Sequence, residues 1–297
     1  MRKTCSESRA DRVFDAFNII IMIVLLFVFI WPLWFVVIAS ISDPVAVTTG
    51  QVFLLPKMIT LEGYQKMLKY TSIWTGYFNT ICYTVVGTVL NLIMSVMMAY
   101  PISDRTYALR KPMLAFYMVT MYFGGGLVPT FLLFKSLGIV NTFWAMIVPG
   151  LISVYNALII RNYFMNSIPE ALKEAATLDG ANAAQYLVRI VLPLSKPVLA
   201  VVGMYYMVGH WNDFANALYY LYDSKYYPLQ TVLRDLLISS RVTAELLVDA
   251  ADVTKAMREA QVMQYGVIIA AALPMLCAYP FIQKYFVKGV MVGSMKG

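Results

Sequence analysis

The side chains best suited to chemistry gather between residues 205 and 216, within an otherwise apolar stretch. Asp213 is the one charge in the run 197–222, and His210 is the only histidine of the chain. An acid inside such a run costs several kcal/mol unless it is solvated or paired. No second acid or cysteine lies near them in this run. We therefore expect neither a catalytic pair nor a metal site here.

Aromatic and amide side chains surround these two residues, and concave sugar sites combine aromatic faces with polar groups. Two interpretations stay open. In the first, the segment lines a translocation path and contacts sugar. In the second, the rings lie at a membrane interface and the polar groups join helices by hydrogen bonds. The residues concerned are Tyr205, Tyr206, His210, Trp211, Asn212, Asp213 and Asn216.

The composition indicates that membrane helices must position this segment. Apolar residues make up 60% of the 297 and charged residues only 13%, against about half and about a quarter in soluble domains. So few charges exclude disorder and most cytosolic enzymes. The net charge of +7 comes without any cluster of five basic residues. We attribute it to the positive-inside bias and expect a lipid bilayer, not nucleic acid, around the chain.

Charge-free runs predict an all-α integral membrane protein with six transmembrane helices. Each run reaches the roughly 20 helical residues that cross a hydrocarbon core. We expect a permease domain over 16–286, between an N-terminal segment 1–15 and a tail 287–297. The runs are 16–42, 70–103, 112–134, 136–160, 197–222 and 260–283.

The distribution of basic residues predicts that both termini are cytoplasmic. With that orientation, 14 of the 23 Lys and Arg residues fall in the inside segments, as the positive-inside rule requires. Segments 43–69 and 223–259 then lie outside, and the second is nearly neutral because it carries five basic and six acidic residues. Each is either a packed cap or a docking surface for a partner.

The inside segment 166–193 predicts a helix-turn-helix. Ser167 and Glu170 have the spacing of a capping box. Strong helix formers follow, and Asp179-Gly180 should end the first helix because glycine readily adopts positive φ. A second short helix is expected over about 181–190. Small residues at Ala175, Ala176 and Gly180 would allow another protein to approach closely.

The same segment carries a family motif. Glu174-Ala175-Ala176, Gly180 after three residues, and Ile190-x-Leu192-Pro193 after nine more match the EAA pattern. On this basis the chain resembles the membrane permeases of binding-protein-dependent ABC importers. Further stretches at 124–130, 211–214 and 227–230 resemble maltose-type carbohydrate permeases. Within these permeases the chain resembles the oligosaccharide and polysaccharide branch that includes the LplC/YtcP-like proteins.

This resemblance implies a type I ABC importer permease fold in a bacterial cytoplasmic membrane. It implies a heterodimer with a sister permease, two cytoplasmic ATPase subunits below, and an extracytoplasmic sugar-binding protein that meets the loop 223–259. The segment 168–190 would be the coupling helix and the tail 287–297 a second ATPase contact. The implied coupling residues are Glu170, Glu174, Ala175, Ala176, Asp179, Gly180, Ala181, Ile190, Leu192 and Pro193.

The chain lacks the Walker A pattern G-x-x-x-x-G-K-[ST], so we do not expect it to hydrolyse ATP. It should need no cofactor of its own, because ATP and Mg²⁺ would bind the partner ATPases. Two alternatives stay open. One is an ABC permease for a different small solute. The other is an autonomous secondary transporter, which would need no docking helix and would usually show repeated halves.

Overall fold

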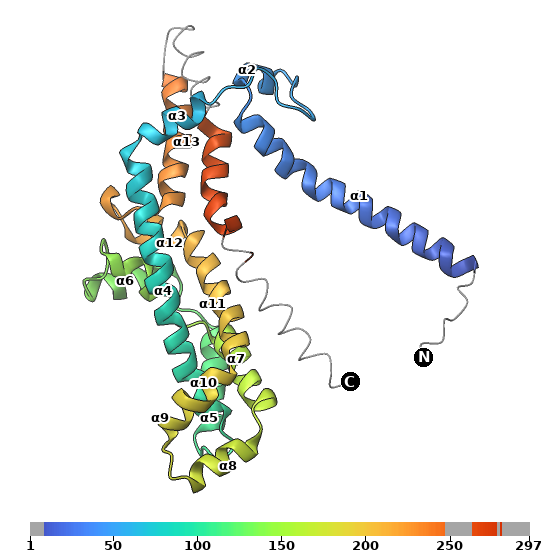
Figure 1. The fold of residues 1–297 in the computed structure, drawn as a ribbon. Coiled ribbons are helices and arrows are strands. Elements are labelled where there is room, and N and C mark those ends of the chain that lie inside the picture. The colour runs from blue at the N-terminus through green and yellow to red at the C-terminus, as the bar shows by residue number, and fades with distance from the viewer. Residues whose placement is uncertain (1–8, 247–262, 278–279, 281–297) are drawn as a thin grey trace. The chain divides into compact units, whose positions relative to one another are not determined.

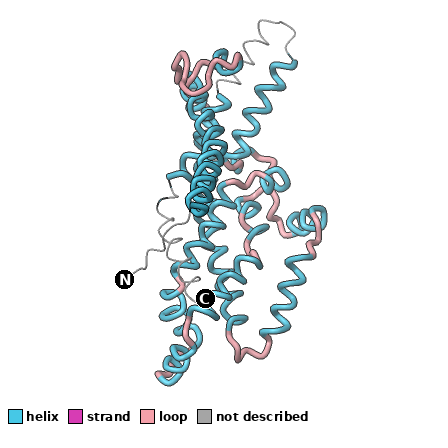
Figure 2. Tube along the Cα trace, turned by 90° about the vertical axis from the view of Figure 1, so that its right-hand side faces the viewer, coloured by secondary structure: helices cyan, strands magenta, loops and turns pink. Residues whose placement is uncertain are grey.

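The computed structural model of the protein describes residues 9–246, 263–277 and 280, and these form helices and loops only (Figures 1 and 2). The all-α prediction is confirmed for this part of the chain. The predicted tail 287–297 and residues 247–259 of the predicted outside segment 223–259 lie outside the described residues. The chain divides into two compact units, Met1–Lys69 with Leu237–Ala272, and Tyr70–Leu236 with Leu273–Gly297.

The first unit contains the long apolar helix α1, Arg9–Ser40, followed by α2, Pro44–Thr48, and α3, Glu62–Lys69. Asp43 caps α2 by accepting a hydrogen bond of 2.9 Å from the Val45 amide. The Tyr64 hydroxyl of α3 donates to Ser40 Oγ over 2.8 Å. These bonds fold the connection between α1 and α3 into a tight turn.

Two helices in the described part are long and apolar enough to cross a membrane unbroken. They are Arg12–Ser40 of α1 and the 33-residue helix α4, Thr71–Ser103. Three further pairs of helices are long and apolar enough to cross a membrane only if the two helices of each pair, which meet at a bend, count as one span. Met263–Cys277 is a shorter apolar helix. Three of the six predicted runs are therefore not single helices.

The third predicted run, 112–134, is broken by three glycines. Helix α5, Arg110–Tyr122, and helix α6, Leu127–Ser136, meet at an angle of 110°. The residues between them include Gly124-Gly125-Gly126, and Gly126 has a φ of 85°. L residues rarely adopt that conformation, so the glycine allows the chain to turn sharply where the apolar pattern alone suggests continuity.

The fourth predicted run, 136–160, is wrong as a single helix. Its first part consists of turns and two 3₁₀ helices, η1, Phe143–Met146, and η2, Val148–Gly150. Gly138 and Asn141 both have positive φ, 69° and 59°, and such residues end regular helices. The α-helix of this region, α7, begins only at Val154 and ends at Ser167.

The fifth predicted run divides into α11, Lys196–Trp211, and α12, Ala215–Tyr220. A short 3₁₀ helix, η4, Ser224–Tyr226, then leads to α13, Leu229–Leu246. In this second unit α4 packs along both α11 and α7. Close approach depends on Gly87 of α4, because a Cβ added there would overlap the ring of His210. Small residues at such contacts are typical of membrane helix pairs.

Candidate functional site

The site begins with α8, Glu170–Leu178, which lies beyond one end of α4 (Figure 1). Its N-cap is Pro169, whose side chain makes no capping hydrogen bond. The predicted Ser167–Glu170 capping box is therefore wrong. Ser167 is still the last residue of α7, and only Ile168 and Pro169 separate the two helices. Proline holds the preceding residue in an extended conformation, so the new helix starts after it.

The end of α8 follows the prediction. Asp179 is the C-cap and Gly180 has a φ of 76°. The Gly180 amide donates to the Thr177 carbonyl over 3.0 Å, and the Ala181 amide donates to the Ala176 carbonyl over 2.9 Å. This pair of bonds is a Schellman motif, which satisfies the last carbonyls of the helix.

The second helix begins at a cap that the sequence analysis missed. Asn182 and Gln185 form a reciprocal capping box. The side-chain oxygen of Asn182 accepts from the backbone amide of Gln185 over 2.8 Å, and the side-chain oxygen of Gln185 accepts from the backbone amide of Asn182 over 3.0 Å. The signal is present in the sequence as Asn-x-x-Gln. Helix α9, Ala183–Tyr186, continues through a π-helical turn, η3, Leu187–Val191, into α10, Leu192–Leu194. The predicted coupling helix 168–190 is thus two helices joined by a capped turn.

The motif residues divide between solvent and the protein's own core. Glu170, Glu174, Ala175, Asp179 and Gly180 are exposed, as is Pro193. Ala176, only 6% exposed, is buried in a cluster with residues of α4, α7, α9 and α11. Ala181, Ile190 and Leu192 are partly buried against the same cluster. The side chain of Ala176 is therefore covered by the chain's own core, and its contact with a partner stays a prediction.

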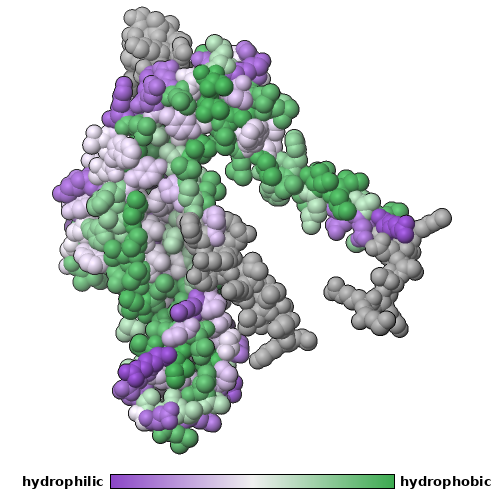
Figure 3. Space-filling view, in the orientation of Figure 1, coloured by the Kyte–Doolittle hydropathy of each residue, from purple (hydrophilic) through white to green (hydrophobic). Residues whose placement is uncertain are grey.

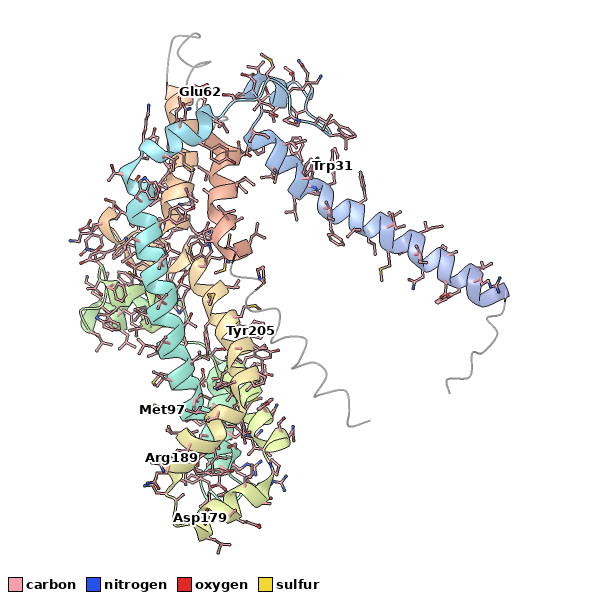
Figure 4. All side chains as sticks on the ribbon, viewed as in Figure 1. Trp31, Glu62, Met97, Asp179, Arg189 and Tyr205 are labelled. Atoms are coloured by element: carbon pink, nitrogen blue, oxygen red, sulfur yellow. The ribbon has the colours of Figure 1, made fainter. Side chains whose placement is uncertain are left out.

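The exposed face of this segment is mixed, with charged and amide residues beside four exposed apolar side chains, Leu172, Leu178, Val188 and Leu194. Hydrophilic residues gather at the end of the second unit that holds α8 and α9 (Figure 3). Figure 4 shows Asp179 at the far end of the segment and Arg189 on the helix that leads back towards α11. Leu178, beside Asp179, is 89% exposed. The described residues offer Glu174 no ion-pair partner.

An ion pair that the sequence analysis did not predict ties α8 to α4. Lys173 Nζ lies 2.7 Å from Asp104 Oδ2, and Asp104 is the C-cap of α4. The other carboxylate oxygen accepts hydrogen bonds from the Thr106 amide, 2.9 Å, and hydroxyl, 2.7 Å. No local spacing indicates this contact, because Lys173 and Asp104 are 69 residues apart.

These contacts set the charge of Asp104. Partial burial alone would raise its pKa, but the hydrogen bonds from Lys173 and Thr106, together with the charge of Lys173, hold the pKa below its ordinary value. The carboxylate therefore stays ionised at neutral pH. Beside the pair lies a cavity of about 400 Å³ that includes Tyr100, Phe164, Pro169 and Glu170 in its lining.

Two of the predicted path residues, His210 and Tyr206, form hydrogen bonds to other residues of the chain. His210 Nε2 lies 2.7 Å from Asn91 Oδ1 of α4, while Asn91 Nδ2 donates to the carbonyls of Gly150 and Leu151. Since the amide nitrogen of Asn91 donates, its oxygen accepts, which places a proton on His210 Nε2. Tyr206 OH lies 2.7 Å from Ser95 Oγ and accepts from the Ser153 amide over 3.2 Å. Both residues join helices.

The remaining predicted path residues lie in different surroundings. Asp213 stands between α11 and α12, where it accepts hydrogen bonds from the Asn216 amide, 3.1 Å, and side chain, 2.7 Å. Trp211 is 4% exposed and packs near Tyr77. Tyr205 is 44% exposed and points away from α4 (Figure 4). Asn212, the C-cap of α11, is also exposed. Only these last two present free surface within the described part.

Near the other end of α4, side chains of the helix bond to main-chain groups of the segment 222–229. Asn79 Nδ2 donates to the carbonyls of Lys225, 2.8 Å, and Tyr227, 3.0 Å. Tyr83 OH donates to the Tyr226 carbonyl over 2.8 Å, and Thr80 Oγ1 accepts from the Leu229 amide over 2.8 Å. Asn79 thus joins α4 to η4 and the residue that follows it.

Metal-binding chemistry finds no support in the described residues, which contain no group of three or more His, Cys, Asp or Glu side chains able to hold an ion. The geometry instead offers a capped, exposed helical pair on a covered apolar base. Such an arrangement is suited to receiving another protein and passing its movement to the membrane helices.

Comparison with known proteins identifies the family, although no family model matches the sequence. Protein LplC of Bacillus subtilis (strain 168) is 38% identical over 294 residues, which cover 99% of this chain and 98% of LplC. The polygalacturonan/rhamnogalacturonan transport system permease protein YtcP of the same organism is 34% identical, over 97% and 99% of the two chains. A chain from the crystal structure of a bacterial ABC transporter involved in the import of the acidic polysaccharide alginate superposes with a TM-score of 0.85. That chain is 31% identical, and the match covers 95% of this chain and 100% of that one. The protein belongs to the family of ABC sugar-importer permeases.

Proposed function

We propose that this chain is one of two different permease subunits of an importer that carries oligosaccharide or polysaccharide fragments into a bacterial cell. The single observation that carries the proposal is the exposed acidic face of α8. Glu170 and Glu174 lie one turn apart on one face of the helix and are exposed, and Asp179 is exposed at its C-cap. Ala176 fixes the helix to the core that α4, α7 and α11 share. A partner that binds this face can move the core together with the helix.

The partner in this proposal is an ABC ATPase on the cytoplasmic side. Its two subunits bind ATP and Mg²⁺ and carry out the hydrolysis, so the permease needs no cofactor. Glu174 is free to pair with a basic side chain of the ATPase, because the described residues give it no ion-pair partner. Closure of the ATPase then moves α8 as a rigid body. ATP and the loaded binding protein must favour the same permease state for the cycle to be coupled.

The orientation in this proposal places both termini in the cytoplasm. It is supported by the 14 of 23 basic residues that fall on that side. The segment after Tyr222 then faces outside, where an extracytoplasmic sugar-binding protein meets it. Tyr205 and Asn212, the two predicted path residues that present surface, are the side chains we assign to the sugar path.

The substrate class in this proposal is an acidic carbohydrate. YtcP is named for polygalacturonan and rhamnogalacturonan, and the alginate transporter for an acidic polysaccharide. Both names point to polymers rich in uronic acids. Oligouronides are therefore the first substrates to test, ahead of neutral oligosaccharides.

The test is ATP-dependent uptake in liposomes that contain the chain with its sister permease, ATPase and binding protein. We expect oligogalacturonides or oligoalginates to stimulate ATP hydrolysis and to be taken up, and neutral oligosaccharides to do less. Replacing Glu174→Ala should lower the stimulation at least about fivefold, the lower bound of a usual coupling free energy. Glu62→Ala on α3 is the matched control, because that acid pairs only within its own helix.

Two outcomes would contradict the proposal. Normal coupling in Glu174→Ala would remove α8 as the ATPase contact. Uptake that follows an ion gradient without ATP would favour the secondary transporter. Stimulation by a solute that is not a sugar would keep the ABC permease and change only its substrate class.

A further inference from the structure

Helix α4 is held at its cytoplasmic end by polar contacts from other elements. Lys173 of α8 pairs with Asp104, and the Tyr100 hydroxyl donates to the Ala183 carbonyl of α9 over 3.1 Å. Arg161 Nε of α7 donates to the Ile102 carbonyl over 3.0 Å. The Lys173–Asp104 pair is the one charged contact between α8 and α4 in the described residues. It fixes where α8 sits against the end of α4.

The opposite end of α4 is held in a different way. Asn79, Thr80 and Tyr83 lie within two turns, and all four of their hydrogen bonds go to main-chain groups of residues 225–229. Such bonds fix the path of the segment whatever side chains it carries. Asn141 holds the start of the segment by accepting from the amides of Tyr222 and Asp223. The segment 222–229 therefore follows α4 if α4 moves.

Between these ends α4 is one uninterrupted helix. From Tyr83 to Asp104 the rise is about 30 Å at 1.5 Å per residue, the thickness of a hydrocarbon core. Buried side chains along this length, including Asn91 and Ser95, bond to α11 and to Gly150 and Leu151 before α7. A helix packed along this length can move as a unit.

We propose that the Lys173–Asp104 ion pair is the positioning contact through which α8 moves α4, and that α4 carries this movement to the segment 222–229 on the other face of the membrane. The inference rests on the proposed function, since it needs an ATPase on α8. It assigns Lys173, Asp104 and Asn79 a role in coupling although none of them belongs to the EAA motif. An exposed ion pair adds little stability, so its role here is to set geometry.

The test measures the segment 222–229 directly while nucleotide binds on the other side. A spin label at Tyr222→Cys reports its movement, because this side chain is 75% exposed and only the backbone amide of Tyr222 bonds to Asn141. The three native cysteines, Cys5, Cys82 and Cys277, are replaced by serine. The whole complex is measured in liposomes with and without ATP and vanadate, and sugar-stimulated ATPase activity is measured in the same samples.

Charge reversal then isolates the ion pair. Asp104→Lys should abolish the nucleotide-dependent change at residue 222 and lower the stimulation at least about fivefold. The double reversal Asp104→Lys with Lys173→Asp should restore both, which a mere loss of folding would not do. Asn79→Leu should abolish the change at residue 222 with the ion pair intact. Glu62→Lys, which breaks an ion pair within α3, should leave both readouts unchanged.

The outcomes separate the inference from the function beneath it. If the unmodified complex couples normally and Asp104→Lys still moves the label, the ion pair does not position α8 and the inference is wrong. A double reversal that stays uncoupled would contradict it equally. If the unmodified complex shows no ATP-dependent uptake of any sugar, the proposed function falls and the inference falls with it.

Discussion

At the scale of single residues, Ala175 and Ala176 show that neighbouring residues of one motif can lie in different surroundings. The two side chains are the same and adjacent, yet Ala175 is exposed and Ala176 is buried against α4, α7 and α9. The helical rotation of about 100° between them turns one outwards and one inwards. The alanine pair therefore presents an exposed side chain at one position and fills the core at the next.

This difference predicts opposite defects from the same substitution. Ala176→Leu should destabilise the permease itself by about 1–3 kcal/mol, the usual cost of overpacking a core. Ala175→Leu should leave the stability of the purified permease pair unchanged but weaken ATPase binding. The measurements are the Tm of the permease pair in detergent and recovery of the ATPase by affinity purification. Equal loss of Tm in both variants would contradict the assignment.

Gly180 is explained by conformation rather than by space. A Cβ at this position would meet nothing within 4 Å, but the φ of 76° lies in the left-handed region. Within the chain, the motif glycine is therefore explained by the Schellman turn, which needs this conformation. Its position could be predicted from the sequence for this reason, because Asp-Gly after a run of helix formers ends a helix by local chemistry alone.

At the scale of the elements, the sequence predicted what local chemistry decides and missed what depends on contacts distant in sequence. Apolar runs located α1 and α4, and the helix-turn-helix of residues 170–194 was expected from its helix formers and its stop signal. The break before α7 was missed because Gly138 and Asn141 interrupt an apolar run without adding a charge. Helix-joining hydrogen bonds were one of the two interpretations for His210 and Tyr206, but their partners could not be predicted, because these lie on α4 and near the start of α7.

The ion pair between α8 and α4 gives a prediction on pH. The pKa of Asp104 lies below its ordinary value of 3.8. A carboxyl with a lowered pKa stabilises the folded state above its ordinary pKa, and that contribution is lost as the pH falls through the lowered value. The Tm difference between the unmodified permease pair and Asp104→Asn should therefore stay constant from about pH 5 to 8 and shrink only below 3.8.

The measurement is the Tm of both proteins in detergent, from about pH 8 down to below 3.8. Lys173→Met is the matched control, since it removes the other member of the pair and should show the same constant difference above pH 5. A Tm difference that disappears between pH 5 and 8 would mean that Asp104 titrates there, which its contacts with Lys173 and Thr106 oppose.

At the scale of the whole molecule, the two polar regions that contact α4 must lie on opposite faces of a membrane. Lys173 and Ala183 contact its last turn, whereas the segment 222–229 contacts residues 79–83. The apolar length between them matches a hydrocarbon core of about 30 Å. The positive-inside rule predicts which face is which, and the proposed orientation has α8 in the cytoplasm.

This sidedness can be tested with two exposed positions in a chain whose native cysteines are serine. Leu178→Cys at the tip of α8 and Tyr222→Cys are 89% and 75% exposed as the native residues. In intact cells a maleimide that cannot cross the membrane should label Tyr222→Cys at once and Leu178→Cys only after the cells are permeabilised. Both positions are open to the reagent, so a difference in labelling reports the side of the membrane and not burial. Labelling in the reverse order would place α8 outside the cell, where no ATP-driven partner could reach it, and labelling of both in intact cells would mean that α4 does not span the membrane.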